Sequence, residues 1–305
     1  MRKTIAIYKK DSSSPESFDL EKFTEMAKEK LDSIDNYSTL KKAMKLFAQN
    51  SSKNTLKPLD VRAKEAFIVK KLDERVFKIQ DKLSAADWVD LINTQSILRH
   101  RNLNLIESCA YNLTKLNDTN VLTIDAIQSL FLSCGVLSFN NVQFFNFLLN
   151  KLKDILKTNE KNSEWIKENE RNLNAIINSI GILKLKDASL LDALVVFLDK
   201  DENIVNHKLI ISFVKSIASL NYKPPGDNFS KLVAKINLNS FKLSEIKEKS
   251  LLIDYVWSLC VLKVQNQELL SSVLAEAFWS SLITGLTIFL NVWTHEIFIS
   301  FIFIC

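Results

Sequence analysis

Lysine and arginine recur in several short connections between apolar segments of this chain. Cationic side chains of this kind contact phosphate oxygens, and aromatic rings beside them stack on unpaired bases. Tyr222 and Phe139 supply such rings. The pattern therefore predicts a surface for single-stranded RNA. Its candidate RNA-binding residues are Arg99, Arg101, Lys184, Lys186, Tyr222, Lys223 and Lys263.

The same cations also have a structural interpretation, which stays open at this point. Lysine and arginine near the C-terminus of a helix are favoured by the helix dipole, typically by about 0.3–1 kcal/mol. The formal net charge of +5 and the sequence pI near 8.8 permit polyanion binding. They fall short of the strongly basic balance that marks a dedicated nucleic-acid domain. The net charge therefore does not decide between the RNA-binding and the structural interpretation.

Catalytic motifs are missing from the sequence. The 4 glycines lie at least 45 residues apart, which excludes a P-loop and a kinase glycine-rich loop. The acids Asp199, Asp201 and Glu202 lie between apolar segments, and we interpret them as a solvated loop. We therefore expect no enzymatic activity and no cofactor.

The cysteines and histidines are too dispersed for a metal site. There is no CxxC or HExxH motif among the 4 cysteines and 3 histidines. We expect Cys109, Cys134 and Cys260 to be buried as small hydrophobic residues on helices, in a reducing compartment.

The elements that carry the basic connections are predicted to be helices. Only 4 Gly and 4 Pro occur in 305 residues, too few for the frequent turns of a β-sandwich or for a doubly wound sheet. A repeat is present instead. Its anchor leucines, spaced 39, 46, 37 and 42 residues apart, are Leu98, Leu137, Leu183, Leu220 and Leu262.

Several positions around the anchor keep their residue type. The residues four before it are hydroxyl-bearing: Thr94, Ser133, Ser179, Ser216 and Ser258. We expect each hydroxyl to bond its own i−4 carbonyl. The residues two before the anchor are small and are predicted to let neighbouring helices approach closely: Ser96, Gly135, Gly181, Ala218 and Cys260. An apolar pair follows seven and eight residues after most anchors and opens a second helix, such as Leu190 to Leu198.

Each unit is thus an antiparallel helical hairpin, and stacking lets neighbours bury the faces that one hairpin cannot. The predicted fold is all-α, an α-solenoid of about five repeats of 37–46 residues. The fourth repeat carries Pro224, Pro225 and Gly226 in its connection and reaches Phe229 two residues late. The polar stretch Lys157 to Arg171 is predicted to be an extended segment between repeats that Trp165 holds to the array.

The sequence divides into five parts. Residues 1–17 are expected to be a disordered N-terminus, and 18–83 N-terminal helices at Phe18 to Leu31, Thr39 to Gln49 and Asp60 to Leu83. Residues 84–249 are hairpin repeats that start with a capping box at Ser84 and Asp87. Residues 250–282 form the last repeat, and 283–305 an atypical hydrophobic tail. The tail is long enough to span a bilayer, but His295 and Glu296 favour a terminal helix or a non-native tail.

The last repeat resembles the leucine-rich subdomain of the FAST kinase domain-containing proteins. The residues that match its VWSL core and ELLxxVL hairpin are Tyr255, Val256, Trp257, Ser258, Leu259, Leu262, Leu269, Leu270, Val273, Leu274 and Phe278. Upstream, the hairpins from Ala86 to Leu238 resemble that family's helical repeats. After Leu282 the family's second subdomain and RAP domain find no counterpart, so we expect a fragment or truncated isoform without the RAP domain's nuclease-like activity.

The resemblance implies an RNA-binding protein of the mitochondrial matrix that regulates RNA processing, stability or translation. Its partners would be single-stranded mitochondrial RNA and other RNA-processing proteins. The N-terminus gives no clean presequence, because acids such as Asp11 and Glu16 appear early. The alternative is a protein-binding α-solenoid scaffold, with or without a membrane anchor in the C-terminal tail.

Overall fold

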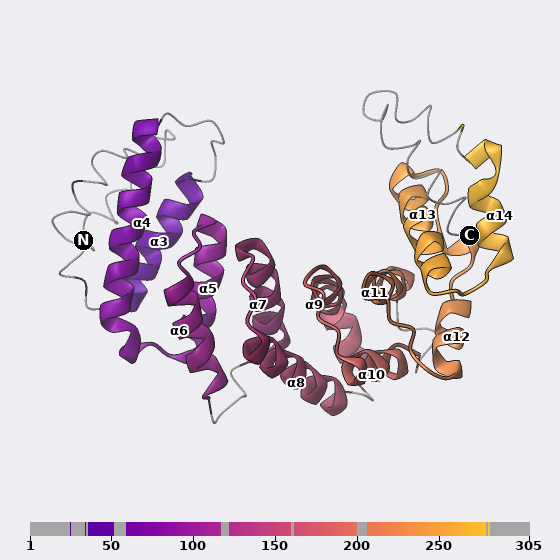
Figure 1. Ribbon diagram of the computed structural model, residues 1–305, viewed down its shortest axis with the longest axis horizontal. Coiled ribbons are helices and arrows are strands. Elements are labelled where there is room, and N and C mark those ends of the chain that lie inside the picture. Colours follow the sequence, from indigo (N-terminus) through magenta and orange to yellow (C-terminus); the bar gives the residue numbers. More distant parts are fainter. Residues whose placement is uncertain are drawn as a thin grey trace. The chain divides into compact units, whose positions relative to one another are not determined.

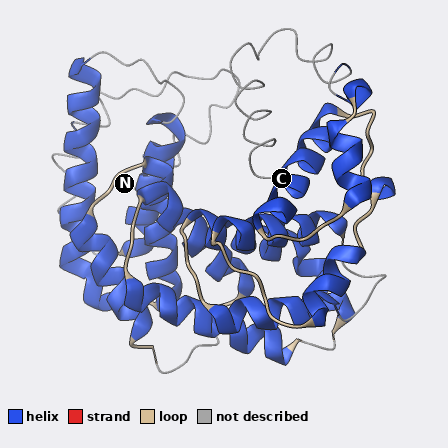
Figure 2. Cartoon of the chain, turned by 45° about the vertical axis from the view of Figure 1, so that its right-hand side comes forward, coloured by secondary structure: helices blue, strands red, loops and turns tan. Residues whose placement is uncertain are grey.

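The computed structural model describes residues 25, 34, 36–51, 59–116, 122–159, 162–199, 206–278 and 280. Within these ranges every regular element is a helix (Figures 1 and 2), which confirms the predicted all-α helical-repeat fold. The α-helices are α3 (Tyr37–Ser51), α4 (Leu59–Ile79), α5 (Ala85–Leu98), α6 (Leu103–Thr114), α7 (Ile124–Leu137), α8 (Val142–Thr158), α9 (Ser163–Ile182), α10 (Ala188–Asp199), α11 (His207–Ser219), α12 (Asp227–Ala234), α13 (Ile246–Val261) and α14 (Gln267–Leu274). The short 3-10 helices η2 (Gln80–Lys82) and η3 (Leu238–Ser240) accompany them.

The predicted hairpins correspond to successive helix pairs, from α5 with α6 to α13 with α14. Leu98 and Leu137 are the last residues of α5 and α7, while Leu183, Leu220 and Leu262 are the C-caps of α9, α11 and α13. Every anchor leucine therefore marks the end of the first helix of a hairpin. The chain divides into two compact units, Met1–Val121 with Val136–Phe144 and Leu122–Gly135 with Phe145–Cys305.

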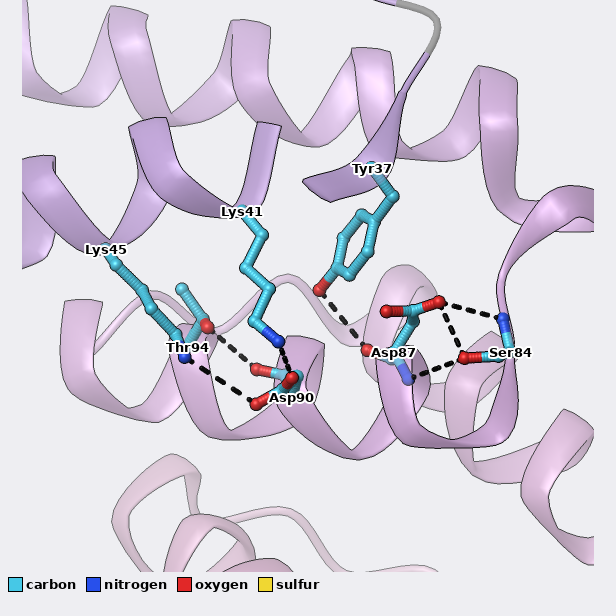
Figure 3. Close-up of polar contacts among 7 residues, drawn as sticks. All are labelled: Tyr37, Lys41, Lys45, Ser84, Asp87, Asp90 and Thr94. Atoms are coloured by element: carbon cyan, nitrogen blue, oxygen red, sulfur yellow. Dashed lines mark hydrogen bonds and ion pairs between the residues drawn. The ribbon is translucent and has the colours of Figure 1, made fainter. Parts of the chain in front are cut away.

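In the first unit, α3 packs on α4 and on α5. Figure 3 shows the polar contacts between α3 and α5. The Tyr37 hydroxyl donates to the Asp87 backbone carbonyl at 3.2 Å, and Lys41 pairs with Asp90. Burial lowers the pKa of Lys41. The predicted capping box is confirmed, since Ser84 N donates to Asp87 Oδ2 at 3.1 Å and Asp87 N to Ser84 Oγ at 3.3 Å. These contacts fix the start of the first hairpin.

In the second unit, the first helices pack in series, α9 on α11 and α11 on α13, and the second helices α10 and α12 pack on each other. In both units the hydroxyl-bearing residues four positions before the anchors are buried, at no more than 5% exposure. Back-bonding to the i−4 carbonyl is confirmed at Thr94, Ser179 and Ser258, at 2.7, 2.8 and 2.6 Å. Ser216 differs, because its hydroxyl donates to the Ile177 carbonyl of α9 at 2.8 Å and so links two hairpins.

The predicted role of the small residues is right at Gly181 and wrong at Gly135. A Cβ on Gly181 would lie 2.9 Å from Ser216 Oγ and 3.0 Å from Ser216 Cα, so α9 and α11 approach as closely as a glycine allows. A Cβ on Gly135 would meet nothing within 4 Å. The same residue in two repeats therefore serves a helix contact in one of them only.

The connections depart from the regular pattern at two places. The stretch Lys157 to Arg171 is not an extended segment, because α9 already begins at Ser163, with the Asn162 side chain accepting from Trp165 N. Trp165 does hold this segment to its own hairpin, with its ring edge-on to Phe197 of α10 at 6.4 Å between centroids. In the fourth hairpin Gly226 has a φ of 82°, and α12 begins directly after it.

The N-terminal helices at 39–49 and 60–83 are confirmed as α3 and as α4 with η2. The expectations for residues 1–17, for a helix at 18–31 apart from Glu25, and for 283–305 lie outside the described residues. No helix in the described part is long and apolar enough to cross a membrane. Cys109 and Cys134 are buried as expected, whereas Cys260 is only half-buried.

Candidate nucleic-acid interface

The residue after each anchor leucine adopts the left-handed backbone conformation. Its φ is 50° at Arg99, 48° at Ser138, 56° at Lys184, 48° at Asn221 and 54° at Lys263. A side chain in this conformation costs roughly 1 kcal/mol, which is why glycine usually occupies this position at helix ends. All five side chains are exposed. Every hairpin therefore presents a polar or basic side chain at the same point of its backbone.

Four of the first helices close with the same backbone hydrogen bond. The N–H two residues after the anchor donates to the carbonyl three residues before it, as in a Schellman motif. The donors and acceptors are His100 to Gln95 (3.0 Å), Leu185 to Ile180 (3.0 Å), Tyr222 to Ile217 (3.0 Å) and Val264 to Leu259 (2.9 Å). The repeat thus extends to individual backbone atoms of the turn that carries the predicted site.

Three of the predicted RNA-binding cations connect one hairpin to the next. Arg101 Nη2 donates to the Ser138 carbonyl at 3.1 Å, and Lys186 Nζ to the Asn221 carbonyl at 3.5 Å. Both cations lie three residues after their anchor, and both acceptors lie one residue after the following anchor. These carbonyls stand at the negative ends of α7 and α11, so the structural interpretation of these cations is supported.

Lys184 makes a related contact. Its Nζ donates to the Ser219 carbonyl at 2.7 Å. The Ser219 hydroxyl donates to the Ser216 carbonyl of its own helix at 2.7 Å and lies 3.2 Å from the Gly181 carbonyl of α9. The last turns of α9 and α11 therefore lie directly side by side. Lys184 and Lys186 remain exposed, and an ammonium group has three donors, so each keeps further donors for a ligand.

The other three cations are more available. Arg99, Lys223 and Lys263 are exposed, and their side chains have no hydrogen-bond or ion-pair partner within the described ranges. Lys223 lies three residues after its anchor, which is the position of Lys186 in the preceding hairpin. Lys263 lies one residue after its anchor, which is the position of Asn221 in the preceding hairpin. We call Arg99 and Arg101 the basic rim of the first unit, and Lys184, Lys186, Lys223 and Lys263 the basic rim of the second.

The aromatic candidates are largely engaged. The Tyr222 hydroxyl donates to Asp192 Oδ1 at 2.7 Å, and Lys186 Nζ lies 5.7 Å from the centre of its ring. Burial, with help from Asp192, raises the pKa of Tyr222 to about 12. Phe139 is 3% exposed and packs edge-on against Phe144. The expectation that Phe139 stacks on a base is therefore wrong, because its ring belongs to the core.

A buried carboxylate that the sequence reasoning missed holds the first rim in place. Asp73 on α4 is 3% exposed and accepts from Gln95 Nε2 at 2.6 Å and from Asn102 Nδ2 at 2.7 Å. His100 Nε2 lies 3.0 Å from its Oδ2. Asp73 thereby ties the turn of Arg99 and Arg101 to α4. In the sequence Asp73 lies four residues after Val69, on the apolar face of the predicted helix, and its burial could be predicted from this position.

The chemistry of the site is that of charge and hydrogen bonding. Among the described residues no group of three or more His, Cys, Asp and Glu side chains could hold a metal ion. Burial raises the pKa of the Cys109 and Cys134 thiols to about 12, so neither is an effective nucleophile near neutral pH. What the rims can do is contact a polyanion.

Fold and site together define a helical-repeat protein with basic helix ends. A family model for FAST kinase-like proteins, covering their subdomain 1, matches residues 210–283, which are 74 of the 305 residues. The resemblance seen in the last repeat is thus confirmed, and the match begins earlier, at Ile210 within α11. It includes Lys223 and Lys263. The curated proteins that were compared with the chain gave no match.

Proposed function

We propose that this protein binds single-stranded RNA through its basic rims and acts on transcripts by occupying them rather than by catalysis. The observation that carries the proposal is that Lys223 and Lys263 are exposed and unpartnered cations within the described ranges, inside the segment that matches the FAST kinase-like family. The match supports an RNA-associated mitochondrial role in general terms. Processing, stability or translation of mitochondrial transcripts is the finer role that we propose from it.

The backbone conformation of Lys263 has an energetic cost. Glycine in place of Lys263 would relieve roughly 1 kcal/mol of left-handed strain, yet a lysine occupies the position. The Lys263 side chain has no hydrogen-bond or ion-pair partner within the described residues, so its ammonium group is available to a ligand. Phosphate oxygens are suitable partners, because each contact releases a counterion and makes the affinity dependent on salt.

The test is the salt dependence of binding to an oligouridylate of roughly twelve nucleotides. The double substitution Lys223→Gln and Lys263→Gln should reduce the slope of log K against log salt by about 1.4, or about 0.7 for each lost phosphate contact with a single strand. Lys247→Gln is the matched control, since Lys247 is an exposed lysine without a partner in the described part of the chain, at the opposite end of α13.

Lys263→Gly removes the same charge while relieving strain, and an unchanged urea unfolding midpoint of this variant would show that a loss of binding does not come from unfolding. An unchanged slope in both Lys263 variants would refute the rim assignment. The scaffold alternative is tested by purifying the protein with its partners from cells and treating the complex with ribonuclease. Partners that remain bound after the RNA is destroyed would favour the scaffold.

A further inference from the structure

A row of exposed apolar side chains accompanies the basic rims. In the first, second, third and fifth hairpins the residue directly before the anchor leucine is apolar: Ile97, Val136, Ile182 and Val261. We call these four residues the apolar row. The fourth hairpin has Ser219 at this position. Ile97 is 46% exposed, Val136 57% and Ile182 75%, while Val261 is half-buried. Single exposed apolar side chains are common on protein surfaces. Their recurrence at one position of a repeat, two residues before the left-handed side chain, is not explained in that way.

The contacts within the second unit place this apolar row beside the basic rim. The Ser219 hydroxyl contacts the Gly181 carbonyl, and Lys184 Nζ contacts the Ser219 carbonyl. Ile182 lies between Gly181 and Lys184 in the sequence, so the row position of α11 adjoins that of α9. The next first helix, α13, also packs on α11, and its residue at the row position is Val261. A ligand that follows Lys184, Lys223 and Lys263 therefore passes the exposed side chain of Ile182 as well.

We infer that Ile182, the most exposed member of the apolar row, contacts the face of an unpaired base while the lysines of the second unit's basic rim contact the phosphates. The inference rests on the proposed RNA binding and deepens it. A single strand carries anionic groups and flat apolar faces side by side, which matches an exposed isoleucine beside basic side chains. A duplex hides its base faces in the stack, so it matches the basic rim alone. Tyr222 and Phe139, whose rings are engaged in the protein, are replaced in this role by aliphatic side chains.

The experiment compares the full chain with its Ile182→Ser variant on two probes, an oligouridylate and inorganic polyphosphate of similar length. Ile182→Ser should weaken oligouridylate binding by about fivefold, as expected when roughly half of an isoleucine is buried by the ligand. The substitution should leave polyphosphate binding and the salt slope unchanged. Val196→Ser is the matched control, an exposed apolar residue on α10 that is not part of the row.

Equal affinities of Ile182→Ser and Val196→Ser for the oligouridylate would overturn the inference while leaving the rim proposal intact, provided the salt slope is present. A fivefold loss on both probes would also overturn it. Tighter binding of an acidic amphipathic helical peptide than of the oligouridylate would overturn it in favour of a protein ligand. If neither polyanion binds, the proposed function itself fails.

Discussion

The close approach of α9 and α11 at Gly181 gives the sharpest test of the repeat packing. We predict that Gly181→Ala destabilises the protein, although alanine in a helix is normally better than glycine by about 1 kcal/mol. The new Cβ would lie 2.9 Å from Ser216 Oγ and 3.0 Å from Ser216 Cα. One of these atoms belongs to the backbone of α11 and cannot rotate away. Relief therefore requires the two helices to separate.

The magnitude follows from two costs and one gain. Overpacking of this kind typically costs about 1–3 kcal/mol. Displacing Ser216 Oγ also endangers its 2.8 Å hydrogen bond to the Ile177 carbonyl, worth about 1 kcal/mol. Against the helix-propensity gain of about 1 kcal/mol, the net loss in the free energy of unfolding should be about 1–3 kcal/mol. Urea unfolding followed by far-UV circular dichroism measures it.

Gly135→Ala is the matched control, because Gly135 holds the same repeat position in α7 and its added Cβ would meet nothing within 4 Å. This variant keeps only the propensity gain and should be more stable than the wild type by about 0.5–1 kcal/mol. The two alanine variants should thus move in opposite directions. If Gly181→Ala proves as stable as Gly135→Ala, the helices do not approach at Gly181 as described.

Two further predictions concern buried polar groups. Asp73→Ala leaves the Gln95 and Asn102 amide donors without their acceptor, so it should lower the free energy of unfolding by about 2–4 kcal/mol in urea titrations. The control is His100→Ala, at the partly exposed side of the cluster, which should cost less than about 1 kcal/mol. Equal effects of the two substitutions would contradict the buried network. Because burial raises the thiol pKa of Cys109 and Cys134 to about 12, both remain neutral at pH 8 and should resist iodoacetamide in the native state, with reactivity rising only as the pH approaches 12. Peptide mapping by mass spectrometry in native buffer and in urea measures this, and alkylation at equal rates in both would show that the two thiols are not buried.

Local residue patterns were enough to predict the class of fold. Helical periodicity and capping are local, so the positions of Leu98 to Leu262, the Ser84 capping box and the hairpin boundaries could be predicted from residues a few positions apart. The family resemblance was also carried by one contiguous stretch and was confirmed over residues 210–283. Local patterns fail between the second and third anchors, where they predict an extended segment and the structure has the first part of α9. The reason is that polar residues such as those from Ser163 onward can extend a helix that is buried on one side only.

Contacts between hairpins determine which basic residues bind carbonyl oxygens of the protein and which are left for a ligand. Arg101, Lys184 and Lys186 reach carbonyl oxygens that lie 35 to 37 residues further along the chain, and no local pattern shows such a contact. The same holds for Gly181 against Ser216 and for buried Phe139. Whether a side chain faces solvent, a carbonyl or a neighbouring helix depends on how successive hairpins pack, and that packing is set by the summed shape of both surfaces rather than by the residue type at either position.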